Sequence, residues 1–521
     1  MNLLDYSIII FYILGFLYLG YRFKTQESGK DYFLGSRDFG WFPLAMSTAA
    51  TQLSAISFIS APAFVGLKQG GGLKWLTYEF AVPLAMIFLM LFLIPPFYRS
   101  GIVSVYAYLE KRFDGSTRVL LSIVFQISRA FGTSVMVYTV ALILSSVMSI
   151  PMWQTIVIIG VVTLIYSYQG GMKAVVYGDM IQMIILFMGI LICLGYGLHY
   201  IGGWDNMMAN VEPERLQVVN FSDWGFGDGE DFGFWPMLFG GLFLYTSYYG
   251  TDQSQVQRLL SASSIKSVQQ TLLSNGLMRF PITLGYCIMG LVIGTFALTN
   301  TDFLALIPEN KPDLMIPIFI RDYLPHGVIG ILIVAIFSAA MSTLSSAINS
   351  LSAATVEDLI SRKKKLDNKT YMRYSHLSAL FWGVVCITLA FFTGDIAKTV
   401  IEAVNKIGSV FYGPILATFI AAVLIKKINA KGANIGLITG VLANVYLWLF
   451  VPEVFWFWWN VIGAFVTLIM GYISSLILPV SKDSGVNLEM KMESKGSGYA
   501  IILLVFFIII VLFSISLPSI F

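Results

Sequence analysis

Two stretches of the chain combine small hydroxyl side chains with otherwise apolar surroundings. Residues 47–60 hold repeated serines and threonines together with Gln52, and Pro62 follows; residues 338–350 repeat the pattern and add Asn349. A hard cation such as Na+ prefers oxygen ligands. In secondary transporters, unwound helix backbone and its neighbours hold the coupling ion. The two stretches therefore predict a cation site, with close helix packing as the structural alternative.

A third polar interruption lies at residues 245–253, where tyrosines and hydroxyl residues end an apolar run. Polar side chains are unfavourable in a helix that faces lipid, so all three stretches should face a cavity. The first and third interruptions fall in the second and seventh apolar runs, which are five runs apart. This spacing suits two repeats of five helices, each beginning with a broken helix.

Four ionisable residues fall inside or at the edge of apolar runs: Glu79, Arg129, Asp179 and Arg279. Charge at membrane depth is a functional hypothesis by default. Asp179 could ligate a cation or cap a helix, because aspartate is a favoured capping residue. Glu79 could bind a solute or lie at the membrane interface. For the two arginines the preferred interpretation is an interfacial side chain that reaches water, and neutralisation of an anionic solute is the alternative.

Apolar helices must position these residues. The chain is 57% hydrophobic and 12% charged, whereas a soluble protein has about 25% charged residues. A bilayer span needs about 20 mostly apolar residues, and the runs lack the alternation of barrel strands. The sequence thus predicts an all-α polytopic membrane protein with about fourteen spans, at 3–22, 41–66, 75–98, 117–148, 152–168, 179–202, 234–254, 271–298, 327–352, 376–394, 398–425, 433–452, 454–478 and 499–520.

Basic residues in the loops predict the orientation, because they favour the inner side. With the N-terminus outside, the inner loops hold 23 of the 32 lysines and arginines and the outer loops hold five. The long outer loop 203–233 is acidic. An even number of spans places both termini outside, and a bacterial inner membrane is the expected location.

Several other classes of protein lack support. A net charge of +3 argues against a nucleic-acid partner. The three cysteines and three histidines are scattered, so neither a disulfide framework nor a transition-metal site is expected. No Gly-x-Ser-x-Gly or His-Glu-x-x-His motif indicates an enzyme, and no filter-like repeat indicates a channel. A solute sensor built like a transporter remains the alternative from a different class.

Four ordered motifs resemble those of the sodium/solute symporter family, and two of them match its branch for iodide, monocarboxylates and multivitamin substrates. The family motifs are residues 170–182, which include Asp179 and Gln182, and residues 250–258. The branch motifs are residues 97–113 and 350–359. The resemblance covers roughly residues 1–450. It implies a single transmembrane domain, 1–521, with a five-plus-five inverted-repeat core like that of a bacterial leucine transporter. The repeats are 41–202 and 234–425, with an extra helix at 3–22 and further helices over 433–520.

The resemblance also implies where sodium binds. Backbone oxygens of Ala50, Leu53 and Ala339 and hydroxyls of Ser342 and Thr343 would form one site. Some members of the family have a second site, whose matching residues here are Asp179, Ser342, Ser345 and Ser346. The matching solute-cavity residues are Ser54, Ser57, Tyr78, Glu79, Tyr248, Arg279 and Asn405, with Tyr248 in the place of an inner-gate tyrosine.

Two departures from the sugar-transporting members bear on the solute. Ser57 stands where those members often have glutamine, and Arg279 lies close to one of their cavity lysines, which favours a carboxylate. A third departure, Gly178 in place of the usual threonine, concerns the motif before Asp179. The sequence therefore predicts a Na+-coupled symporter for a small anionic organic solute of the monocarboxylate type. A sugar, sugar acid or sialic acid is the main alternative, and inorganic anions such as iodide and vitamins follow. The expected partners are sodium, the solute and the bilayer, with a monomer as the functional unit.

Overall fold

The computed structural model describes residues 1–26, 28–53, 55–229, 232–309, 311–363, 366–392, 400–478 and 496–520. Within these ranges the chain is helical and its only β-pairing consists of two isolated bridges. The α-helices, in chain order, are α1 (Leu3–Arg22), α2 (Gly29–Leu34), α3 (Trp41–Gln52), α4 (Ala55–Gly66), α5 (Ala81–Phe88), α6 (Ile94–Arg99), α7 (Tyr106–Arg112), α8 (Gly115–Met148), α9 (Met152–Ile201), α10 (Trp204–Asn210), α11 (Phe234–Thr251), α12 (Gln253–Leu260), α13 (Ile265–Thr299), α14 (Thr301–Ala305), α15 (Met315–Tyr323), α16 (Val328–Ala354), α17 (Asn368–Ala390), α18 (Val400–Leu424), α19 (Ala430–Phe450), α20 (Trp456–Ile477) and α21 (Ser497–Ile520).

Short 3-10 and π segments complete the chain path. The 3-10 helices are η1 (Gly35–Arg37), η2 (Leu73–Phe80), η4 (Pro213–Leu216) and η5 (Pro312–Leu314), and the π-helices are η3 (Leu89–Leu93) and η6 (Thr355–Ile360). Because η2, α5, η3 and α6 follow one another without a gap, they form one span from Leu73 to Arg99.

Ten helices in the described part of the chain are long and apolar enough to cross a membrane, or eleven if the bent pair α3–α4 is one span. The predicted number of fourteen is therefore not confirmed. Part of the difference comes from α9, which joins two predicted spans, and from α11 and α17, which are outside this set. The end of α11 is rich in tyrosine and hydroxyl residues, and α17 begins with polar and basic residues.

The long helix α9 is two helices that meet at Gly171. At about 1.5 Å per residue, its 50 residues would extend far beyond the roughly 30 Å of a bilayer core. Gly171 has φ 51° and ψ −146°, which is not helical, and a Cβ at this position would lie 2.6 Å from the carbonyl oxygen of Tyr32. The break falls inside the predicted loop between the fifth and sixth spans, and the second part of α9 carries Asp179.

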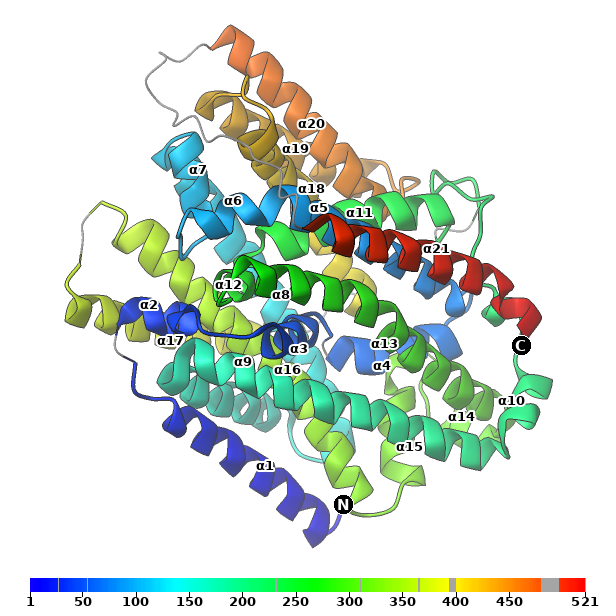
Figure 1. Ribbon diagram of the computed structural model, residues 1–521. Coiled ribbons are helices and arrows are strands. Elements are labelled where there is room, and N and C mark those ends of the chain that lie inside the picture. The colour runs from blue at the N-terminus through cyan, green and yellow to red at the C-terminus, as the bar shows by residue number, and fades with distance from the viewer. Residues whose placement is uncertain are drawn as a thin grey trace.

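The predicted break in the second span is present. α3 ends at Gln52, Leu53 is not helical, and the axis of α4 is turned by 55° from that of α3. The helix that faces this break, α16, is buried along almost its whole length and packs against α9, α8, α1 and α17 (Figure 1). Because α16 is buried on all its faces, its hydroxyl-rich stretch included, it is the central element of the bundle.

The first helix and the last three lie around this centre (Figure 1). α1 packs on α9 and α16, α21 packs on α5 and α13, and α19 and α20 pack tightly on each other and on α18. A Cβ at Gly436 of α19 would lie 2.4 Å from the carbonyl oxygen of Thr467 on α20, so these backbones approach closely. The division of the core into two inverted repeats stays a prediction.

Gly171→Ala should lower the stability of the protein. A side chain there is strained by its positive φ and meets the backbone of Tyr32, and such strain is worth about 1–3 kcal/mol. We expect the melting temperature in detergent, followed by size-exclusion chromatography, to fall by several degrees. Gly15→Ala is the matched control, because a Cβ at Gly15 of α1 meets nothing within 4 Å. An equal melting temperature for both variants would contradict the role of the break.

Candidate sodium and solute site

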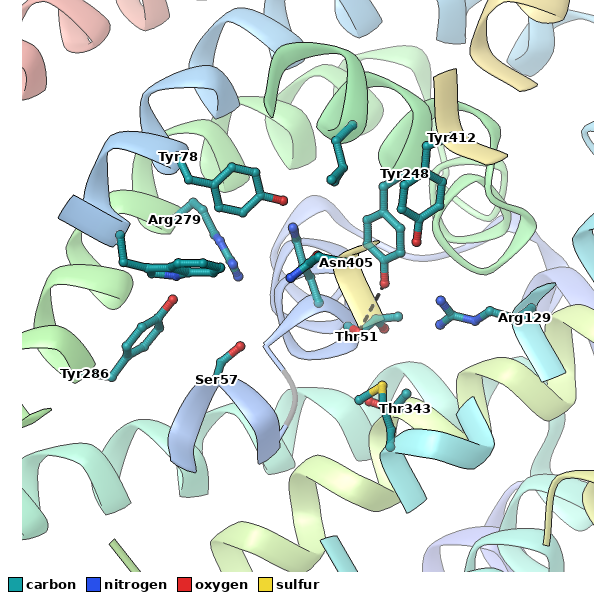
Figure 2. A pocket seen from close by; sticks show the side chains of 14 residues that line it. Thr51, Ser57, Tyr78, Arg129, Tyr248, Arg279, Tyr286, Thr343, Asn405 and Tyr412 are labelled. Carbon is teal, nitrogen blue, oxygen red and sulfur yellow. Dashed lines mark hydrogen bonds between the residues drawn. The ribbon is translucent and has the colours of Figure 1, made fainter. Parts of the chain in front are cut away.

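A central cavity of about 110 Å³ lies beside the break between α3 and α4. Its walls come from η2, α3, α4, α8, α11, α13, α16 and α18, and Figure 2 shows polar side chains reaching it from several sides. Five of the predicted solute residues line it: Ser57, Tyr78, Tyr248, Arg279 and Asn405. Glu79 is held against Arg279. Ser54 lies outside the described residues.

Glu79 and Arg279 form a buried ion pair at one end of the cavity. The guanidinium donates from Nε to Oε2 at 2.9 Å and from Nη2 to Oε1 at 3.1 Å. The Glu79 side chain is fully buried and that of Arg279 is 7% exposed. The interfacial interpretation of both residues is therefore wrong. The third nitrogen, Nη1, is buried without a hydrogen-bond partner in the described part of the chain, and Arg279 lines the cavity.

Aromatic side chains form much of the wall next to this pair. Tyr78 stacks on Tyr245 with ring centroids 4.4 Å apart, and Trp75 packs against Tyr78 at 5.7 Å. Trp75 and Tyr286 line the cavity with Tyr78. Rings of this kind present apolar faces together with a few polar groups, which is the usual chemistry of a small-molecule pocket.

Tyr248 and Tyr412 stand on the opposite side of the cavity from Arg279 (Figure 2). The Tyr248 hydroxyl donates to the backbone oxygen of Thr51 at 3.3 Å, and the two tyrosine rings meet edge to face. Tyr249 also bonds to Gln52. Two tyrosines of α11 thus hold the last residues of α3, so a movement of α11 would alter both the cavity and the helix break.

Two of the three backbone ligands predicted for sodium lie where α3 ends, and the third, Ala339, lies on α16. Leu53 has φ −79° and ψ 85°, and the last carbonyls of a helix lack an intrahelical partner. The oxygens of Ala50 and Leu53 therefore have the character of ion ligands. The hydroxyl of Thr51 lies 3.3 Å from that of Ser346, which shows that this helix end is in contact with α16.

The hydroxyl ligands predicted for sodium lie on the regular helix α16. Thr343 donates to the backbone oxygen of Ala339 at 3.2 Å and lines the cavity, and Ser342 donates to Asp179 Oδ1 at 2.6 Å. All of these groups are buried. The donor set contains only carbonyl and hydroxyl oxygens, which fits Na+ and the way discontinuous helices hold it.

Of the residues predicted for a second sodium site, Ser342 contacts Asp179, which also has an unexpected neighbour, Arg258. Ser47 and Ser342 donate to its carboxylate at 2.6 Å each, and Arg258 Nη2 lies 2.7 Å from Oδ2. Arg258 also donates to Ser346. A sodium ion at Asp179 therefore has to share the carboxylate with a buried arginine.

Ser345 is also buried in α16, but its hydroxyl donates to the backbone oxygen of Ser342 at 3.0 Å. The helix-capping alternative for Asp179 is wrong, because Asp179 lies inside α9 and binds side chains of α3, α12 and α16.

Two arginines of the site were not predicted as site residues. Arg258 is fully buried and ends the motif 250–258, so its place in that motif was a usable signal. Arg129 lines the cavity and its side chain is only 11% exposed, so its interfacial interpretation is also wrong. The sequence signal for Arg129 was a charged residue in the middle of the fourth predicted span.

The sodium:solute symporter family matches residues 32–440. The chain belongs to this family. The human sodium/iodide cotransporter is 29% identical over 434 residues, which are 83% of this chain and 67% of the relative. Sodium-coupled monocarboxylate transporter 2 of Bos taurus is 29% identical over 447 residues, 85% of this chain and 69% of the relative. The structure of a substrate-bound, outward-open Na+-coupled sialic acid symporter has 25% identity and a TM-score of 0.81, covering 92% of this chain and 98% of that one.

The resemblance to the sodium/solute symporters is thus confirmed. This symporter is an integral membrane protein of a family of transporters, not enzymes, and sodium is its coupling ion. Its partners are sodium and a small solute. The match ends at residue 440, so α20 and α21 lie beyond it.

Glu79→Gln should destabilise the symporter, because it leaves the buried charge of Arg279 uncompensated. Breaking a buried pair from one side removes about 3–5 kcal/mol, so we expect a clear fall in melting temperature and in the yield of monodisperse protein. Glu453→Gln is the control, since Glu453 is exposed. The double variant Glu79→Gln/Arg279→Gln should recover part of the stability. A double variant less stable than Glu79→Gln alone would count against the pair.

Proposed function

We propose that this symporter imports a small monocarboxylate with sodium by alternating access. The observation that carries the proposal is the guanidinium of Arg279. Glu79 holds two of its nitrogens, and the buried Nη1 has no partner in the described chain. An arginine fixed by a carboxylate on one side is well placed to bind a second carboxylate on the other.

The size and walls of the cavity support a small solute. A volume of about 110 Å³ is well below the roughly 300–1,000 Å³ of pockets for drug-sized ligands. Trp75, Leu244 and Met136 add apolar surface for a short carbon chain. Among the relatives, the bovine protein is by name a monocarboxylate transporter and the human protein is by name an iodide cotransporter. Monocarboxylates and iodide are both small anions.

A sialic acid or other sugar acid is the second candidate. The sialic acid symporter structure favours it by its close overall similarity, and Arg279 would serve such a carboxylate equally well. The cavity would have to widen substantially for a solute of that size, and Ser57 supplies only one hydroxyl where sugar-transporting members often have glutamine. We therefore rank the monocarboxylate first.

Charge compensation links the solute to sodium. The ion pairs of Glu79 with Arg279 and of Asp179 with Arg258 are each neutral. We place Na+ between α3 and α16, on the oxygens of Ala50, Leu53 and Ala339 and the hydroxyls of Ser342 and Thr343, so that one ion and one carboxylate together add no charge. The membrane potential supplies about 2.3 kcal/mol per charge per 100 mV to inward sodium movement.

The proposal also includes a second sodium site, an inverted-repeat core, a tyrosine gate, a membrane location and a monomeric unit. Asp179, Ser345 and Ser346 together with Ser342 are the ligands we propose for a second sodium. The core is an inverted repeat, and Tyr248 is part of the gate towards the side that carries the basic loops. The bacterial inner membrane is the location, with both termini outside. One chain supplies the whole cavity and every proposed ligand, so the functional unit is a monomer.

Uptake into proteoliposomes tests the proposal. We expect labelled pyruvate or lactate to accumulate with an inward Na+ gradient and not with an inward K+ gradient, while glucose, galactose and pantothenate do not. Arg279→Lys should raise the half-saturation concentration several-fold, because a lysine cannot hold Glu79 in two places and the solute as well. Sodium-driven uptake of sialic acid alone would select the second candidate. A sodium-dependent rise in melting temperature without any uptake would favour a sensor.

Ser342→Ala should weaken the binding of sodium more than the stability of the fold. We expect the sodium concentration for half-maximal uptake to rise at least tenfold, because the variant lacks a proposed ligand hydroxyl. Ser350→Ala is the matched control on the same helix: Ser350 is buried, and its hydroxyl donates only to the backbone oxygen of Ala347. An unchanged sodium dependence in Ser342→Ala, with normal expression, would refute the placement of the ion.

A further inference from the structure

Arg129 of α8 is largely buried, with its side chain 11% exposed, and its hydrogen bonding among the described residues is incomplete. In the described chain, Arg118, Arg258 and Arg279 each lie within 3 Å of a carboxylate oxygen, at 2.6, 2.7 and 2.9 Å. Arg129 Nη1 lies 3.6 Å from Asp252, beyond hydrogen-bond distance. Its Nε and Nη2 are buried and have no partner among the described residues.

The acidic neighbour of Arg129 is engaged through one of its two oxygens, and the other, Oδ2, is the one that faces Arg129. Asp252 caps α12, and its Oδ1 accepts from both the backbone and the hydroxyl of Ser254. The guanidinium also lies near the face of Tyr248, 5.8 Å from the ring centroid. A guanidinium that is buried without complete hydrogen bonding is energetically unfavourable. The unpaired nitrogens of Arg129 therefore point to a ligand that accepts their hydrogen bonds.

A second group on the same face of α8 is also unpartnered. Thr133 follows Arg129 by four residues, which places the two side chains one above the other. Its hydroxyl is buried and has no hydrogen-bond partner in the described chain. Both residues line a second cavity of about 70 Å³, which Tyr412 also lines. Guanidinium and hydroxyl donors facing one cavity are the chemistry that binds a carboxylate.

This second cavity continues the first. Arg129, Met136 and Tyr412 line both. The first cavity reaches Arg279, and the second reaches Asp252 and Tyr106. Tyr106 belongs to α7, which lies in the loop region 99–115 with its basic residues. In Figure 2, Arg279 and Arg129 approach from opposite sides with Tyr248 and Asn405 between them.

We propose that Arg129 and Thr133 form a second carboxylate site, which holds the solute after it passes Tyr248 and before release on the basic side. This inference rests on the proposed function, because it takes the same solute. The two arginines bind in turn: Arg279 receives the carboxylate from the acidic side, and Arg129 receives it when the gate of Tyr248 and Tyr412 opens.

Transport from each side of the membrane tests the site. In inside-out vesicles, Arg129→Gln should raise the half-saturation concentration of lactate on the basic-loop side at least fivefold. In right-side-out vesicles, the value on the acidic-loop side should change less than twofold. Arg129→Lys should restore part of the affinity on the basic side, and Thr133→Val, which keeps the shape of the side chain, should raise the value two- to fivefold there. Arg279→Gln is the comparison, because it should weaken binding from the acidic side.

A purely structural role of Arg129 gives a different pattern. It would lower the melting temperature and the transport rate from both sides alike, without a one-sided change in half-saturation. Equal effects on the two sides, or none on either, would overturn the second site. If the unaltered protein transports no carboxylate with sodium, the proposed function fails and this inference fails with it. If the unaltered protein does transport a carboxylate but Arg129→Gln acts equally on both sides, only this inference fails.

Discussion

The structure depends on one constraint: a polar group inside a bilayer must be paired or must face a cavity. The buried carboxylates Glu79, Asp179 and Asp358 each meet an arginine from a distant part of the chain. These pairs tie η2 to α13, α9 to α12 and α8 to η6. Each pair joins separate helices, and the pair of Glu79 with Arg279 joins two elements that line the cavity, η2 and α13.

The remaining polar groups gather where the pairing is incomplete. α3 stops at Gln52 and leaves backbone oxygens opposite the hydroxyls of α16, while Arg279 and Arg129 keep unpartnered nitrogens beside cavities. A cation and an anion can satisfy these two kinds of group at the same time. This complementary set is the basis of the proposed co-transport of sodium with a carboxylate, because binding of either ligand alone would leave part of it unsatisfied.

Sequence patterns predicted the groups whose chemistry is local. The hydroxyl-rich stretch with Pro62 indicated the broken second span, and the motif around Asp179 indicated the family. Patterns failed where partners are far apart. The interfacial interpretation of Arg279 was wrong because Glu79 lies 200 residues away, and hydropathy contains no information about that contact. The predicted count of spans was not confirmed, because α11 and α17 are not among the helices long and apolar enough to cross a membrane. The break of α9 at Gly171, in contrast, lies in the loop predicted between the fifth and sixth spans.

By itself, therefore, the sequence determined the class of this protein: an all-helical, sodium-coupled membrane symporter with a break in its second span. The oxygen ligands for sodium at that break stay a prediction. Apolar length, polar interruptions and ordered motifs are properties of neighbouring residues, so they can be read along the chain. Only the tertiary structure decided which charges neutralise each other and which stay open, because that depends on helices brought together from distant segments. It placed Arg258 on Asp179 and turned Arg279 towards the cavity. Among the described residues it left two nitrogens of Arg129 and the hydroxyl of Thr133 without hydrogen-bond partners, beside the second cavity.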